Sequence, residues 1–226
     1  MLPLRDNVPT RSRPLVTYAL IAANVLVWVL YQLPGLQASV DELGYHPCEV
    51  DSTCPTVGEG WLLTAITSMF LHGSWAHLLG NMLFLWIFGN NVEDALGKAR
   101  FLVFYLLGGV AALATQTIVT LMVASEADGT IPNVGASGAI SAVLGAYLVL
   151  LPRARVLTLF VFVLREIPAA FFLLIWFGFQ LLDGSASLSH PEQGGGVAFF
   201  AHIGGFVFGA AAVKLFQKRR PLSPAY

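Results

Sequence analysis

Six apolar stretches, separated by loops whose charges alternate in sign, limit what this chain can fold into. The chain is 56% hydrophobic and only 11% charged, whereas soluble domains carry about 25% charged residues, so an integral membrane protein is predicted. The stretches lie at about 15–33, 74–91, 101–123, 137–151, 168–182 and 199–216. Since 226 residues leave no room for a large soluble domain as well, we expect an all-α polytopic bundle of six transmembrane helices. This bundle would occupy residues 15–217, with tails at 1–14 and 218–226.

The charged residues predict how the bundle is oriented. If the N-terminus lies in the cytoplasm, all 12 Lys and Arg residues fall on the cytoplasmic side, and the opposite loops contain only acidic residues. This distribution follows the positive-inside rule, so we expect both tails in the cytoplasm and the chain in a bacterial plasma membrane. Glu93 and Asp94, after the second stretch, are expected in a solvated cytoplasmic turn. The composition makes the lipid bilayer the expected partner, and the net charge of −1 predicts no nucleic-acid partner.

The fourth stretch is too short to cross the membrane. From Ser137 to Leu151 it would form roughly 22 Å of helix, whereas the hydrocarbon core is about 30 Å thick. Pro132 and Gly135 discourage extension upstream, and Pro152 with its basic neighbours keeps the other end at an aqueous face. Ser137 would therefore lie below the outer surface, at a helix N-terminus whose free N–H groups need a polar neighbour. We expect a water-filled cavity beside it, because non-helical backbone at membrane depth must be covered by protein or water.

Polar and small residues recur on single faces of the second and sixth stretches. His77 and Asn81 are four residues apart and therefore project together from the second helix. In the sixth helix His202, Gly205 and Gly209 share a face. The Gly205-x-x-x-Gly209 spacing allows two helix backbones to approach closely.

The fourth stretch has a matching smooth face. Ser137, Ser141 and Gly145 repeat at four-residue intervals, with Gly138 and Ala142 beside them. We therefore expect the fourth and sixth helices to pack together. This contact would bring the serine and the histidine near their outer ends to the same depth.

These residue types suit acyl transfer. A serine hydroxyl becomes a good nucleophile when a neutral imidazole takes its proton, which His202 could do for Ser137. Acyl transfer also needs donors for the developing oxyanion, and the candidates are the Ser137 N–H, the Asn81 amide and the His77 ring. Asp183 is the only nearby carboxylate, and we do not expect it to orient the histidine. The sequence therefore predicts a Ser–His dyad without a metal or other cofactor.

The three motifs together resemble the rhomboid family of intramembrane serine proteases over about residues 60–216. They are His77-x-x-x-Asn81, Gly135-x-Ser137-Gly138 and Ala201-His202-x-x-Gly205-x-x-x-Gly209. The resemblance implies that Ser137 is the nucleophile, His202 the general base, and His77 and Asn81 the oxyanion stabilisers. It also implies that the substrates are single-span membrane proteins, cut in or near the outer part of the transmembrane segment.

The resemblance also assigns roles to two further regions. It makes the first outer loop a membrane-embedded element and the fifth stretch, with the loop after it, a substrate gate. The sequence alone gives an ordinary lipid-facing helix equal weight for the fifth stretch. One position departs from the family, since some members carry a tyrosine stacked on the histidine where this chain has Ser141. We expect packing, or a contact from the Ser141 hydroxyl, to hold His202 instead.

The first outer region leaves two questions open. Cys48 and Cys54 could form a disulfide or remain free thiols. Residues 61–71 are apolar but too short to span, so they are expected to lie in the membrane interface. His72 follows them, and a hydrogen-bonded structural histidine is favoured there.

A small membrane transporter and an inactive rhomboid-like scaffold are the alternative functions. Buried polar groups and broken helices also occur in small transporters, but the six stretches show no internal repeat. A rhomboid-like scaffold without activity would be expected to lack the serine or the histidine, and both are present. The sequence predicts neither the physiological substrate nor the oligomeric state.

Overall fold

The structure, a computed structural model, is mostly helical. It describes residues 1–55, 59–123, 129–189 and 198–223. Four helices are long and apolar enough to cross a membrane, and they coincide with the first, third, fifth and sixth predicted stretches. The first consists of α1 (Leu15–Val27) with the π-helical segment η1 (Trp28–Gln32). The others are α6 (Lys98–Val123), α9 (Ala169–Ser189) and α10 (Phe199–Phe216). The chain is therefore an integral membrane protein with at least these four candidate spans.

The second predicted stretch is helical but interrupted. It comprises α4 (Trp75–Phe84), the π-helical segment η4 (Leu85–Gly89) and α5 (Asn90–Leu96), which follow one another directly. It is not one of the four helices that meet the length and composition for a span. Ser74 caps the start of α4, because its hydroxyl accepts a hydrogen bond of 3.1 Å from the His77 N–H.

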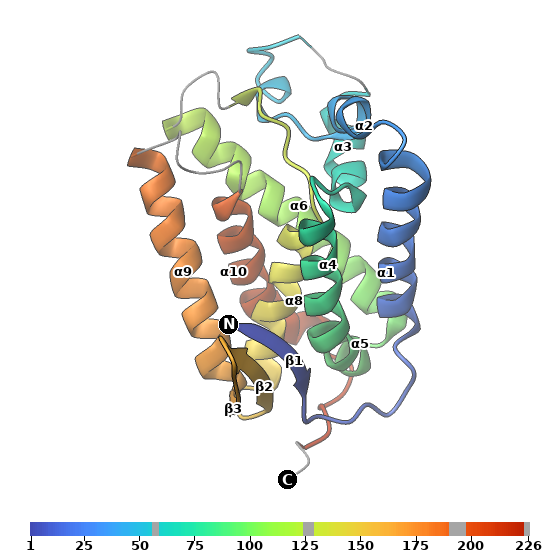
Figure 1. Ribbon diagram of the computed structural model, residues 1–226, viewed down its shortest axis with the longest axis vertical. Helices are drawn as coiled ribbons and strands as arrows, with labels where there is room; N and C mark the ends of the chain where they lie inside the picture. The colour runs from blue at the N-terminus through green and yellow to red at the C-terminus, as the bar shows by residue number, and fades with distance from the viewer. Residues whose placement is uncertain (56–58, 124–128, 190–197, 224–226) are drawn as a thin grey trace.

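Helix α8 (Ser137–Leu150) is short and central. Its 14 residues correspond to about 21 Å of helix, and it begins at the serine that the sequence places at its N-terminus. Every residue from Gly138 to Tyr147 is buried, and α8 packs against α10 and α6 (Figure 1). The fourth helix is thus the core of the bundle.

Glycines bring α8 and α10 into backbone contact. A Cβ on Gly205 would collide with the Gly138 carbonyl oxygen, and one on Gly209 with that of Ala142. The relationship is reciprocal, since a Cβ on Gly145 would meet the Phe206 carbonyl. Only residues without a side chain permit this separation, which is the contact that the small-residue spacing of the two stretches indicates.

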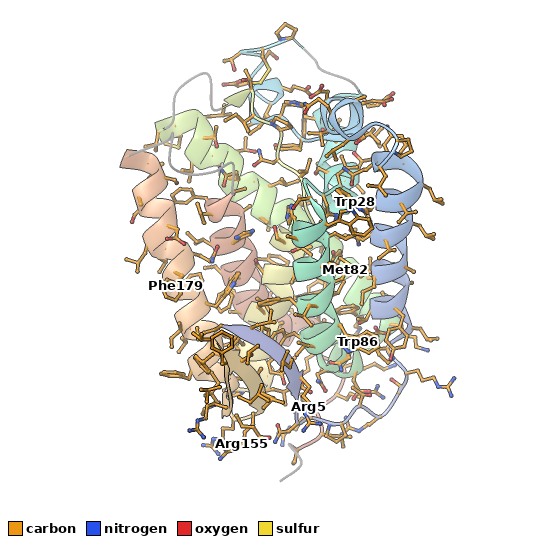
Figure 2. The ribbon with its side chains drawn as sticks, in the orientation of Figure 1. Arg5, Trp28, Met82, Trp86, Arg155 and Phe179 are labelled. Atoms are coloured by element: carbon orange, nitrogen blue, oxygen red, sulfur yellow. A yellow bond between two sulfur atoms is a disulfide. The ribbon has the colours of Figure 1, made fainter. Side chains whose placement is uncertain are left out.

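The expectation of an all-α fold is wrong at one end of the bundle. A three-stranded antiparallel sheet, in the order β1-β2-β3, is formed by β1 (Leu2–Asp6), β2 (Arg155–Phe160) and β3 (Val163–Pro168). Residues 2–6 of the predicted N-terminal tail therefore pair with the segment after α8. Strands β2 and β3 each contain two β-branched residues, which favour strands, but all three strands are too short to give a clear pattern. Figure 2 shows Arg5 and Arg155 at this end of the molecule.

Glu93 and Asp94 are buried, which corrects their prediction as a solvated turn. Their exposed fractions are 2% and 3%. Glu93 accepts hydrogen bonds from the Thr17 N–H and hydroxyl at 2.7 and 2.8 Å, which stabilises the N-terminus of α1. Asp94 forms ion pairs with Arg219 at 2.7 Å and Arg11 at 3.4 Å. The two carboxylates are buried because distant parts of the chain supply their partners.

The opposite end holds the first long loop. It contains α2 (Leu36–Leu43), the 3-10 turn η2 (Pro47–Glu49), α3 (Trp61–Thr67) and the 3-10 turn η3 (Ser68–Phe70). Cys48 and Cys54 are joined by a disulfide, which decides between the two alternatives for them. Tyr45 and Asn133 exchange backbone hydrogen bonds of 3.1 and 2.7 Å, so this loop is attached to the segment that leads into α8.

Candidate active site

The segment before α8 places Ser137. In this segment, the Gly135 N–H donates a hydrogen bond of 2.9 Å to the Ser68 carbonyl. Gly135 has a φ of 129°, which favours glycine, and a Cβ there would lie 2.8 Å from two atoms of the His77 ring. Glycine is therefore required both for the turn and for the close approach of His77.

Ser137 and His202 meet across the contact between α8 and α10. The Ser137 Oγ lies 2.8 Å from the His202 Nε2, which is a short hydrogen bond. Both residues are only partly buried. The two residues chosen from the sequence as nucleophile and base are thus within proton-transfer distance.

His202 is held from its other side by Gln180, a residue that none of the sequence motifs includes. The His202 Nδ1 lies 2.7 Å from the Gln180 Oε1 on α9, and the Trp176 ring is tilted over the imidazole with ring centroids 6.0 Å apart. The sequence does contain a hint of this role. Gln180 is a polar residue within an apolar stretch and lies four residues after Trp176, on the same helix face.

Ser141 and Asp183 do not contact the imidazole in the described structure. The Ser141 hydroxyl donates a hydrogen bond of 2.7 Å to the Ser137 carbonyl, so the expected alternative contact with His202 is wrong. The Asp183 side chain is exposed on α9, one turn beyond Gln180. The group that orients His202 is therefore a neutral amide, consistent with the expectation that Asp183 does not do so.

A cavity of about 260 Å³ connects the predicted site residues. Ser137, His202, His77 and Asn81 all line it, together with apolar side chains. Asn81 is 8% exposed, and its Nδ2 has no hydrogen-bond partner within the described ranges. A buried donor without a partner is costly, and here it is available to a ligand in the cavity.

His77 is packed beside a second histidine. The rings of His72 and His77 meet edge to face with centroids 5.1 Å apart. His72, in the loop between η3 and α4, exchanges backbone hydrogen bonds with the Gln32 side chain at 2.8 and 3.0 Å, but its ring nitrogens have no partner among the residues described. Burial, and secondarily the neighbouring His77, lowers the pKa of His72 to about 3, so its ring is neutral.

A smaller cavity of about 30 Å³ adjoins the other side of Ser137. Ser68, Asn133 and Gly135 contribute to its lining. This volume is sufficient for a water molecule, and the lining offers polar partners for it. The serine therefore has a large, mostly apolar cavity on one side and a small one with a few polar groups on the other.

The fifth helix covers the site from outside the core. Within α9, Phe177 stacks on Phe206 of α10 with centroids 4.5 Å apart, and Trp176 and Gln180 contact His202. Most of the segment predicted as the flexible loop after this helix, residues 190–197, lies outside the described residues. The helix itself runs from Ala169 to Ser189 and so extends beyond the predicted end at residue 182.

Comparison with known proteins agrees with this geometry. The Rhomboid domain matches residues 59–219, which include all the site residues named above. The chain is 35% identical over 137 residues to Rhomboid protease GluP of Bacillus subtilis, covering 61% of this chain and 25% of that protein.

Two mitochondrial proteins are similar over more of the chain. Human Presenilin-associated rhomboid-like protein is 30% identical over 214 residues, 90% of this chain and 50% of the relative. Rhomboid protein 1 of Saccharomyces cerevisiae is 30% identical over 194 residues, 86% and 51% of the two chains. The chain spans about half the length, or less, of these curated relatives. From the domain match and these similarities, the chain belongs to the rhomboid family.

Proposed function

We propose that this protein is an intramembrane serine endopeptidase that uses a Ser137–His202 dyad. The observation that carries the proposal is the 2.8 Å contact between the Ser137 Oγ and the His202 Nε2. This contact lies in a cavity that also presents the unpartnered Nδ2 of Asn81. A nucleophile, a base and an oxyanion donor thus converge on one space, as acyl transfer requires.

The hydrogen bonds indicate how the proton moves. When the His202 Nδ1–H donates to the Gln180 Oε1, the Nε2 lone pair faces the Ser137 hydroxyl. His202 then takes the serine proton as the hydroxyl attacks the peptide carbonyl, and returns it to the leaving amine. The Ser137 N–H, the Asn81 amide and the His77 ring would stabilise the oxyanion. Water then hydrolyses the acyl-enzyme, and the small cavity that Ser68 and Asn133 help to line would hold it.

The proposed topology has six spans. We assign the second span to α4, η4 and α5, and the fourth to the short helix α8, with the sheet and both termini in the cytoplasm. Support comes from the basic residues, which all lie in segments that this arrangement places on the cytoplasmic side. The disulfide Cys48–Cys54 suits the opposite, oxidising compartment of a bacterial plasma membrane. The site would then open toward the outer face.

The substrates proposed are single-span membrane proteins. Helix α9 would act as the gate, because its apolar outer face meets lipid while its inner face contacts His202. Support comes from its low burial, since 22% of its most apolar window lies inside the protein, the smallest share among the four candidate spans in the described chain. A substrate helix could therefore reach the dyad by displacing α9 rather than a core helix.

Covalent labelling tests the proposal. The protein, purified in detergent, is treated with a fluorophosphonate probe and labelled protein is measured with time. Wild type and the control Ser185→Ala, whose hydroxyl donates to the Leu182 carbonyl of its own helix, should label equally. Ser137→Ala should not label, and His202→Ala should label much more slowly. Labelling that persists in Ser137→Ala would overturn the dyad, and a wild type that neither labels nor cleaves a membrane-spanning reporter would favour the inactive scaffold.

A further inference from the structure

A third and larger cavity lies at the end of the bundle opposite to Ser137. Its volume is about 960 Å³, and it is formed where α8 and α10 end and the C-terminal segment turns back. Five cationic residues line it, and no acidic residue in the described chain does so. These residues are Arg153, Lys214, Lys218, Arg219 and Arg220. A concave surface with charges of one sign concentrates the electrostatic field inside it.

Four of these cations have no ion-pair partner in the described ranges. Arg219 is occupied, because it bonds the Asp94 carboxylate at 2.7 Å, and Lys214 lies 3.2 Å from the Gln217 side chain. The remaining side chains, those of Arg153, Lys218 and Arg220, are exposed. The cavity therefore presents uncompensated positive charge.

The wall that carries the cations is held in place. The N–H groups of Lys218 and Arg219 both donate to the Ala95 carbonyl at 3.0 Å. The Arg220 carbonyl accepts a hydrogen bond of 2.8 Å from Arg11. With the ion pair between Arg219 and Asp94, these contacts fix residues 218–220 against the end of α5. The backbone that carries three of the cations is thus positioned before any ligand arrives, which lowers the entropy cost of binding.

The rest of the lining includes an apolar wall. Val149, Leu150 and Leu222 contribute to it. Leu215, beside Lys214 in the last turn of α10, is 84% exposed. An exposed leucine at this position indicates that hydrocarbon reaches the last turn of α10, so the cations after it lie at headgroup depth.

We propose that this cavity binds the phosphate of an anionic phospholipid, with Arg153, Lys218 and Arg220 as its ligands. Basic pockets at the cytoplasmic ends of membrane helices suit such headgroups, and the apolar wall would contact the start of the acyl chains. A free phosphate ion would use the cations but not this wall. Because α8 carries Ser137 and α10 carries His202, the lipid would join the far ends of the two helices that form the dyad. The site does not depend on the proposed peptidase activity.

Thermal unfolding and native mass spectrometry test this site. The delipidated protein in nonionic detergent receives phosphatidylglycerol, phosphatidylcholine or inorganic phosphate. The test variant is Arg153→Gln/Lys218→Gln/Arg220→Gln. The matched control is Arg5→Gln/Arg155→Gln/Arg165→Gln, which removes the same charge from exposed positions on the sheet. Arg153→Lys/Arg220→Lys retains the charge. Mass spectra report bound lipid directly, so the result does not depend on the stability of the test variant.

Phosphatidylglycerol should raise the unfolding temperature of wild type, the control and the lysine variant by roughly 5 °C. It should leave that of the test variant nearly unchanged, with few bound lipids in its spectra. The proposal is overturned if the test variant binds phosphatidylglycerol as well as the control does. It is equally overturned if phosphatidylcholine gives the same shift, or if millimolar phosphate alone gives the full shift, which would indicate a site for a free anion.

Discussion

Gln180 on α9 and His202 on α10 are joined by a hydrogen bond of 2.7 Å between Oε1 and Nδ1. This bond selects the tautomer in which the Nδ1 of His202 carries the proton and the Nε2 is free to accept one from Ser137. Because the partner belongs to α9, the orientation of the base depends on the position of that helix. Movement of the proposed gate helix α9 would therefore break the hydrogen bond that orients His202 when a substrate enters. The return of α9 would form this hydrogen bond again.

Replacing Gln180 tests this dependence. In Gln180→Leu the acceptor is lost while the volume is nearly kept, so the imidazole loses one hydrogen bond of about 1 kcal/mol. The rate of fluorophosphonate labelling should fall about fivefold, with little change in unfolding temperature. Gln180→Glu retains an acceptor and should label faster than the leucine variant. Equal labelling of Gln180→Leu and wild type would show that Trp176 packing alone orients His202.

Removing the Asn81 amide should separate activity from stability. The Asn81 Nδ2 is buried without a partner in the described structure, so Asn81→Ala removes no folding interaction of that atom. The unfolding temperature should stay the same or rise slightly. Turnover of a membrane-spanning reporter should fall by about 10²- to 10³-fold if the amide stabilises the oxyanion. A variant that cleaves the reporter at the wild-type rate would remove Asn81 from the proposed mechanism.

Two glycines provide a matched test of the contact between α8 and α10. In Gly205→Ala the new methyl group meets the Gly138 carbonyl, so the helices must separate, at a cost of about 1–3 kcal/mol. In Gly178→Ala, on α9, the methyl group has no atom within 4 Å, and helix propensity favours alanine by up to about 1 kcal/mol.

Thermal unfolding and labelling should therefore distinguish the two glycine variants. Gly205→Ala should unfold at a lower temperature and label slowly, because separating the helices also moves His202 away from Ser137. Gly178→Ala should match or exceed wild type in stability and keep its labelling rate. If Gly205→Ala behaves like Gly178→Ala, the backbone contact does not hold the dyad together.

The contact between α8 and α10 was predictable because local patterns specify it. Proline, glycine and arginine delimit α8 within one stretch of sequence, and the spacing of small residues shows which faces can approach. The side of His202 that contacts Gln180 was not predictable in this way. The aromatic composition of α9 indicates a lipid-facing helix, and only the packed structure shows that Gln180 reaches the imidazole.

The misassigned regions depend on partners far apart in the sequence. Strand β1 is stable because Leu2 pairs with Leu159 and Asp6 with Val156, and neither segment alone has the length to indicate a sheet. Asp94 is buried because Arg219 neutralises it. In both regions the segment is short and carries charged residues, which favours a solvated loop until the distant partner is known.

The loop between β2 and β3 contains a strained residue whose replacement should stabilise the protein. Val161 has a φ of 54° and is 80% exposed, and a β-branched residue in this region costs about 1–2 kcal/mol. A two-residue hairpin loop with a positive φ at its first position prefers glycine there. Val161→Gly should therefore raise the free energy of unfolding by up to about 1 kcal/mol, after the entropy cost of glycine in the unfolded chain. The control Val163→Gly, in a regular strand position, should lower it. Thermal unfolding in detergent measures both, and a loss of stability in Val161→Gly would mean that the Val161 side chain contributes more than its backbone strain costs.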